Sequence, residues 1–165
     1  MTGSLGRSPL ATYGMPFIAG FLSTLLFHQG ALTVLWLTGA IPRTPYDMTT
    51  TPPLGMPAVM SLAFWGGLWG VMIWPSLKNT VGRSYWIRAL LIGAFVPSIV
   101  ALFIVFPLKA RGVAGGWDPK IIVGALVLNG AWGLGVALFM WIASRSAVDL
   151  DEGLAQRGPR RVADR

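Results

Sequence analysis

The sequence predicts an all-α integral membrane protein whose four transmembrane helices form an up-down bundle. Three observations carry this prediction. Apolar residues of the AVILMFWYC set make up 54% of the 165 residues, and charged residues make up only 12%, whereas a typical soluble domain carries about 25% charged residues. The mean hydropathy is +0.63. Most directly, four long windows of the sequence contain no charged residue.

These uncharged windows define the predicted spans. A helix needs about 20 residues to cross a hydrocarbon core of about 30 Å, and each window holds one such segment. We expect a transmembrane domain over residues 1–146, with spans at residues 16–38, 56–74, 89–106 and 121–142. Residues 147–165 are polar, and we expect them to form a cytoplasmic tail, with a short helical extension and then a disordered end.

The third span contains an internal proline, Pro97. Proline has no backbone N–H, and its ring presses on the carbonyl group four residues earlier, which here belongs to Gly93. We therefore predict that the third helix is kinked at Pro97.

The distribution of basic residues predicts the orientation in the membrane. An even number of spans places both termini on the same side of the membrane. The segments on that side carry more Lys and Arg residues than the segments on the other side. The richer side is expected to be cytoplasmic, so both termini are predicted to lie there, and the size and pattern are typical of the bacterial inner membrane. The richer side holds Arg7, Lys78, Arg83, Arg88, Arg145, Arg157, Arg160, Arg161 and Arg165, and the other holds Arg43, Lys109, Arg111 and Lys120.

Composition excludes several classes of function. The chain has no Cys, which excludes disulfides, thiolate nucleophiles and iron–sulfur clusters. The net charge of +7 lies in the flanks of the spans, so we expect no nucleic-acid partner. No catalytic motif is recognisable, and we expect that the protein is not an enzyme. The expected partners are the lipid bilayer and other membrane chains, or a second copy of this chain.

His28 is the strongest candidate functional residue, because ionisable side chains are costly inside a membrane. It can form an interhelical hydrogen bond, ligate a haem iron or a chlorophyll-type magnesium, or line a solute pathway. Gln29 and Asn129 are the other strong polar groups at depth. In antiparallel first and fourth helices, His28 and Asn129 lie at similar depths, about 18 Å from one side and about 12 Å from the other. We therefore predict that they pair.

Small residues predict close helix packing at two places. Gly66 and Gly70 form a GxxxG pair in the second span, and Gly130 and Gly133 give the fourth span a small face. Such residues let helix backbones approach closely, either within the chain or between chains. The connection between the first two spans, Ile41 through Pro57, is rich in Pro and Thr. It is interpreted as a stiff connection, with a docking loop or a cap over a cavity as alternatives.

These features favour a non-catalytic accessory or interaction subunit of a membrane assembly. The first alternative is a small homo-oligomeric transporter or channel that uses His28, Gln29 and Asn129. The second is a haem- or pigment-binding protein whose ligand is His28.

Overall fold

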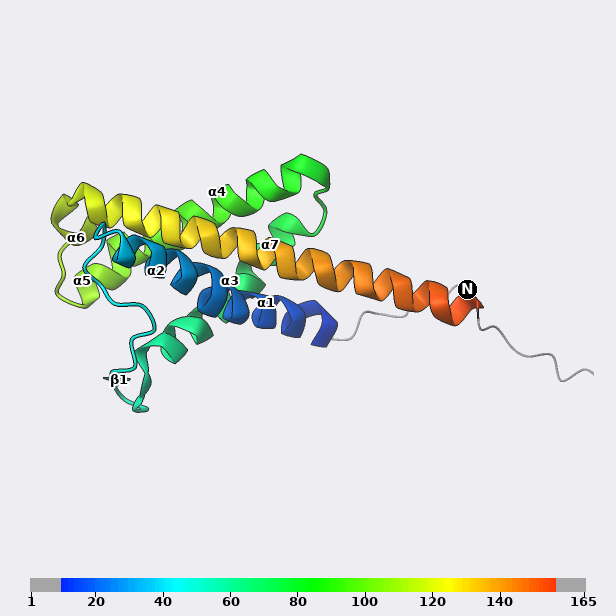
Figure 1. Ribbon diagram of the computed structural model, residues 1–165, viewed down its shortest axis with the longest axis horizontal. Coiled ribbons are helices and arrows are strands. Elements are labelled where there is room, and N and C mark those ends of the chain that lie inside the picture. The colour runs from blue at the N-terminus through cyan, green and yellow to red at the C-terminus, as the bar shows by residue number, and fades with distance from the viewer. Residues whose placement is uncertain (1–9, 157–165) are drawn as a thin grey trace, which may run out of the picture.

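The computed structural model describes the backbone of residues 10–156 and the side chains of residues 12–146. This part of the chain is mostly helical (Figure 1). Four helical stretches are long and apolar enough to cross a membrane: Thr12–Leu37, Ala58–Leu77, Gly82–Leu108 and Pro119–Ser146. They agree with the predicted class, an all-α integral membrane protein.

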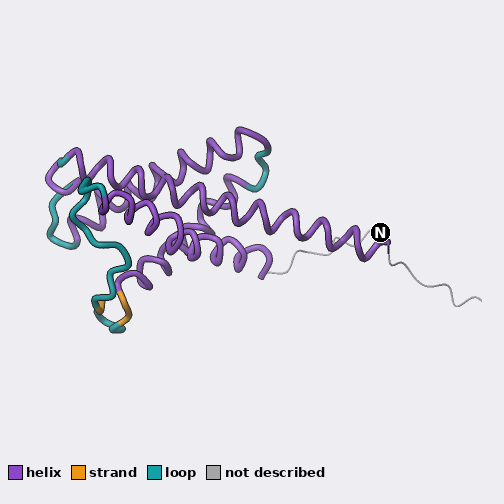
Figure 2. The backbone as a smooth tube through the Cα atoms, in the orientation of Figure 1, coloured by secondary structure: helices purple, strands orange, loops and turns teal. Residues whose placement is uncertain are grey.

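The first two stretches differ in regularity. The first stretch contains α1 (Met15–Ser23) and α2 (Gln29–Leu37), which are joined by a π-helical segment, η2 (Thr24–His28), and preceded by another, η1 (Leu10–Gly14). The second stretch is the single helix α3 (Ala58–Leu77). Between them, β1 (Thr50–Thr51) and β2 (Met56–Pro57) pair antiparallel in a short hairpin (Figure 2).

The second half of the chain begins with α4 (Gly82–Val100), η3 (Ala101–Val105) and α5 (Phe106–Leu108), which follow one another without a break. The short element α6 (Ala114–Trp117) leads into α7 (Pro119–Gln156), which is the longest helix described. Helix α4 packs along α7, and α1 packs against both α3 and α7 (Figure 1).

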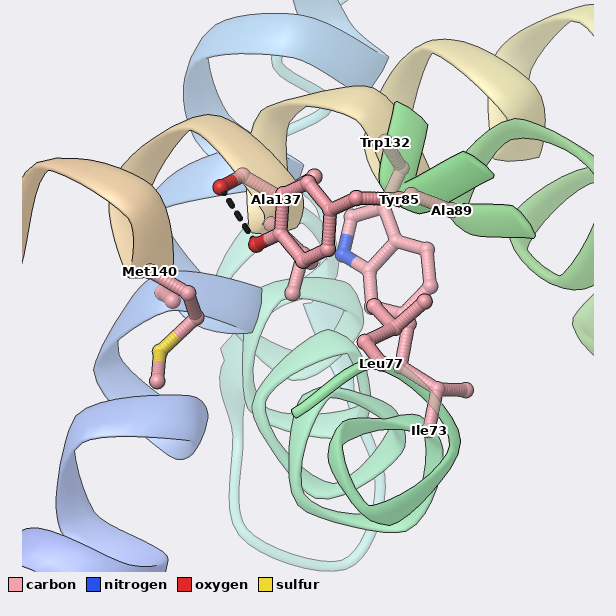
Figure 3. Close-up of a cluster of buried hydrophobic side chains, with 9 residues drawn as sticks. Ile73, Leu77, Tyr85, Ala89, Trp132, Ala137 and Met140 are labelled. Atoms are coloured by element: carbon pink, nitrogen blue, oxygen red, sulfur yellow. Dashed lines mark hydrogen bonds between the residues drawn. The ribbon is translucent and has the colours of Figure 1, made fainter. Parts of the chain in front are cut away.

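The core lies where α3, α4 and α7 meet (Figure 3). Leu77, Ala89 and Val136 are fully buried there, and Trp132 is 2% exposed. Polar atoms on the core aromatic rings are satisfied by backbone carbonyl groups. The Tyr85 hydroxyl donates to the Ala137 carbonyl over 2.8 Å, and Trp132 Nε1 donates to the Gly20 carbonyl over 2.9 Å. These bonds fix large side chains without leaving an unpaired donor in an apolar interior.

The last helix continues past the fourth predicted span. We expected that span to end near residue 142, followed by a short helical extension and then a disordered end, and α7 continues to Gln156. Six of residues 147–156 are strong helix formers, namely Ala147, Leu150, Glu152, Leu154, Ala155 and Gln156. The rest of the tail lies outside the described residues.

Candidate functional site

The site is built on the π-helical segment that interrupts the first membrane helix. In regular α-helix geometry, the N–H of Gln29 bonds to the carbonyl of Leu25. Here it points to the carbonyl groups of Thr24 and Leu26. The Leu25 carbonyl oxygen accepts a hydrogen bond from the hydroxyl of Tyr46, over 3.0 Å. The irregular turn thus offers a backbone acceptor to the following loop, and such turns are frequent at functional sites.

Tyr46 binds this turn through two hydrogen bonds, which together we name the Tyr46 latch. In addition to the bond from its hydroxyl group, its backbone N–H donates to Gln29 Oε1 over 2.8 Å. Gln29 is only 3% exposed, so its amide oxygen needs a partner inside the protein. The backbone of Tyr46 has φ +52°, which few residues other than Gly adopt. The latch therefore holds the loop between α2 and α3 against the first helix.

The same loop is tied to the start of α3 and to itself. The Val59 N–H donates to the Asp47 carbonyl oxygen, and the Ala58 N–H donates to that of Thr49. Asp47 Oδ1 accepts hydrogen bonds from the hydroxyl and the N–H of Thr49, over 2.7 and 2.9 Å. These bonds lower the pKa of Asp47 below its ordinary value, so its carboxylate stays ionised at neutral pH.

A small hollow of about 10 Å³, roughly the space of one water molecule, lies beneath this loop. Its polar lining comes from Gln29, Arg43, Thr44 and Asp47. Its apolar lining comes from Leu32 on α2 and from Ala58, Val59 and Leu62 on α3. Arg43 and Asp47 both line the hollow beside the buried Gln29, and the positive charge of Arg43 adds to the lowering of the Asp47 pKa.

His28 is the last residue of the π-helical segment and precedes Gln29. Its Nδ1 is buried and has no hydrogen-bond partner among the described residues. A buried polar atom without a partner costs about 1–3 kcal/mol, so native proteins seldom retain one without a reason. His28 therefore keeps the capacity to accept a hydrogen bond or to bind a ligand.

The predicted pair of His28 with Asn129 is not formed. Asn129 lies on α7, and its Nδ2 donates to the hydroxyl of Ser98 on α4, over 2.9 Å. Ser98 is 1% exposed. Helix α4 packs along α7 and supplies the Ser98 hydroxyl group as the partner of Asn129. His28, Gln29 and Asn129 consequently do not share a hydrogen-bond network.

The predicted small faces lie at helix contacts within the chain. Gly66 and Gly70 face α1, where a Cβ atom would meet Thr24, Pro16 or Gly20. Gly130 and Gly133 face α4. A Cβ on Gly130 would lie 3.1 Å from Leu90 Cδ1.

Gly93 also contributes to the contact between α4 and α7. A Cβ on this residue would lie 2.6 Å from the Cα of Gly133. Pro97 is buried one turn further along α4. The π-helical segment η3 begins four residues after it, and the Ala101 N–H points to the carbonyl groups of Pro97 and Ser98.

Three residues of the site escaped the sequence analysis. Tyr46 lies in a Pro- and Thr-rich stretch that gives no signal of contact with the preceding helix. Ser98 is a single hydroxyl in an apolar span, and such residues commonly bond to their own helix. Ser23 donates to the Trp132 carbonyl over 2.5 Å, and no local pattern predicts that long-range bond.

No protein-family model matches the chain, and neither a curated protein nor a solved structure shows significant similarity to it. Within the described residues, no group of three or more His, Cys, Asp or Glu side chains is placed to hold a metal ion.

Proposed function

We propose that the protein is a non-catalytic accessory or interaction subunit of a membrane assembly, and that the loop between α2 and α3 makes the contact. The observation that carries this proposal is the exposure of two large apolar side chains on a fixed loop. Met48 is 65% exposed and Leu54 is 79% exposed, and both lie outside the four helical stretches. Figure 2 shows the hairpin of this loop projecting from the helices.

A fixed loop suits docking because little conformational entropy is lost on binding. The Tyr46 latch holds one end of the loop. The hairpin is closed by hydrogen bonds from the Gly55 N–H to the Thr51 carbonyl and from the Thr51 hydroxyl to the Met56 carbonyl, each 2.9 Å long. Apolar side chains displayed in this way favour a protein partner that buries them.

The polar groups of the spans support the same proposal. Ser23, Thr24, Gln29 and Ser98 are buried, and each forms a hydrogen bond within the chain. The bonds of Ser23 and Ser98 join two helices, the bond of Gln29 holds the loop, and the bond of Thr24 lies within its own helix. The helices thus act as a scaffold, and the loop provides the surface for recognition.

For the membrane topology, we propose the up-down bundle with both termini in the cytoplasm of a bacterial inner-membrane protein. Figure 1 supports this arrangement, because the beginning of α1, the α3–α4 connection and the distal part of α7 lie towards the same end. The described Lys and Arg residues divide equally between the two sides, and the excess that the sequence predicts comes from Arg7 and the Arg residues of the tail, which lie outside the described residues. Arg145 stacks on the Trp141 ring at 4.0 Å, which suits a membrane interface. The π-helical segment after Pro97 supports a kink in the third span.

Photo-crosslinking in native membranes tests the proposed contact. A crosslinking amino acid at position 54 is expected to capture a defined partner chain. The matched control is position 81, where Val81 is 84% exposed in the α3–α4 connection at the opposite end. We expect Leu54→Ser to release the partner during purification in mild detergent, and Val81→Ser to leave it bound. A chain that migrates alone at monomer size, without crosslinks at position 54, would contradict the proposal.

The unpartnered Nδ1 of His28 favours a second candidate, in which His28 ligates haem or a pigment or lines the pathway of a small transporter. A neutral imidazole can serve either role. An absorption spectrum of protein prepared with cofactor present tests the first role, and liposome flux measurements test the second. A spectrum with only the ultraviolet band of Trp, together with flat flux traces, would reject this candidate.

A further inference from the structure

An apolar groove of about 320 Å³ runs along the first turns of α7 (Figure 1 shows the elements that form it). We name it the α2–α7 groove. The facing wall is formed by Leu35 of α2 and by the turn that follows it, and α7 contributes a stripe of residues. The lining residues are Leu35, Ala40, Ile41, Pro119, Lys120, Val123, Gly124 and Val127. Gly124 has no side chain, and the Ile41 side chain packs over it, since a Cβ there would lie 2.9 Å from Ile41 Cδ1.

The groove is chemically polarised along its length. Val123 and Val127 are 57% and 46% exposed, and they lie one and two turns below Lys120 on the same helix face. The distance along the axis from Lys120 to Val127 is about 10 Å, at 1.5 Å per residue. The groove therefore has an apolar bed that continues into the span and a single cation at its end.

Lys120 is available to bind an anion. Its side chain is exposed, and it forms no ion pair within the described part of the chain. The nearest acid in sequence, Asp118, uses Oδ1 to accept the backbone N–H of Lys120 over 2.8 Å. This bond caps the first turn of α7 and does not involve the ammonium group. Lys109 and Arg111, in the connection that precedes α7, add positive charge to the same end of the chain.

We propose that the α2–α7 groove is a binding site for one anionic phospholipid. An acyl chain lies along Val123 and Val127, and the phosphate group meets the ammonium of Lys120. Charge complementarity selects this occupant, because a partner helix would need only the apolar bed and would leave Lys120 unused. A lysine ammonium forms charge-assisted hydrogen bonds with phosphate oxygens, and its charge favours a headgroup with a net negative charge over a zwitterionic one. This inference does not depend on the loop contact proposed above.

Native mass spectrometry of protein reconstituted in vesicles of equal phosphatidylglycerol and phosphatidylethanolamine tests the site. The wild-type chain is expected to retain phosphatidylglycerol preferentially. Lys120→Gln should reduce this preference about fivefold. Lys109→Gln is the matched control, because it removes the same charge from the same end of the chain without touching the groove, and it should leave the preference unchanged.

A second pair of variants tests the apolar bed. Val123→Trp fills the groove and should reduce total lipid retention. Val34→Trp alters an α2 residue of similar exposure, 60%, that does not line the groove, and retention should be unchanged. The proposal would be overturned if Lys120→Gln and Lys109→Gln changed the preference for phosphatidylglycerol equally, or if Val123→Trp retained as much lipid as the wild-type chain. A stable dimer that the same Trp substitution disrupts would also overturn it, since a second copy would then occupy the groove.

Discussion

Tyr46→Phe is the substitution that tests the latch most cleanly. It removes one hydroxyl group and keeps the ring, so the Leu25 carbonyl loses the donor at 3.0 Å while packing is preserved. The second bond of the latch uses the backbone N–H of Tyr46, and the substitution does not remove it. The perturbation is therefore confined to the acceptor that the π-helical turn offers to the loop.

The size of the effect follows from the environment of this bond. A neutral hydrogen bond contributes about 0.5–1.5 kcal/mol, and a buried acceptor left unpaired costs about 1–3 kcal/mol. Tyr46 is 46% exposed, so water can reach the vacated carbonyl in part. We therefore expect Tyr46→Phe to lower the free energy of unfolding by about 0.5–1.5 kcal/mol.

The assay combines stability with a local measurement. Denaturant unfolding in mixed micelles gives the stability change, and hydrogen exchange reports how often the Tyr46 N–H leaves Gln29. Tyr13→Phe is the matched control, since Tyr13 is 61% exposed and forms no side-chain hydrogen bond among the described residues. Faster exchange at position 46 is expected only in Tyr46→Phe. If both variants unfold and exchange alike, the latch does not hold the loop.

Two further predictions concern the helix contacts. Gly133→Ala should lower stability by about 1–3 kcal/mol, because its Cβ would press on the Ala89 carbonyl. Gly30→Ala is the control, because its Cβ would meet nothing within 4 Å. Alanine favours helix over glycine, so this substitution should raise stability by about 0.5–1 kcal/mol. Thermal unfolding of both variants measures the difference. Ser98→Ala and Asn129→Ala should show a coupling of about 0.5–1.5 kcal/mol in a double-mutant cycle, and strictly additive effects would contradict their hydrogen bond.

The membrane class was predictable because it depends on composition and on the length of uncharged windows. Both are properties of the sequence itself and need no knowledge of tertiary contacts. The π-helical turn at Thr24–His28 was not predictable, because it depends on where helix hydrogen bonds shift by one residue. A short helical extension after residue 146 was expected, but the residue at which it ends was not predicted, because the ends of helices fray.

The site was predictable only in its residue types. Polar side chains inside apolar spans were recognised as candidates, but their partners depend on which helices are neighbours. Asn129 bonds to Ser98 because α4 packs along α7. Gln29 bonds to Tyr46 because the loop folds back on the first helix. Depth along the membrane, which the sequence does provide, cannot choose between neighbours at the same depth.

His28 differs from these residues, and this difference leads to the last prediction. Its Nδ1 is buried and has no partner in the described part of the chain, so the imidazole carries a desolvation cost that no hydrogen bond offsets. Removing such a group in favour of an apolar side chain of similar volume is neutral or stabilising. We therefore expect His28→Leu to leave the free energy of unfolding unchanged or to raise it by up to about 1–2 kcal/mol.

Asn129→Leu provides the contrast, because that substitution leaves the buried Ser98 hydroxyl without its donor and should destabilise the protein by about 0.5–2 kcal/mol. Thermal unfolding of both variants in the same detergent measures the difference. A clear loss of stability in His28→Leu would show that the imidazole has a structural partner after all. Retained stability combined with loss of a bound cofactor or of solute flux would mean that His28 is kept for binding at a cost to stability, as is common at functional sites.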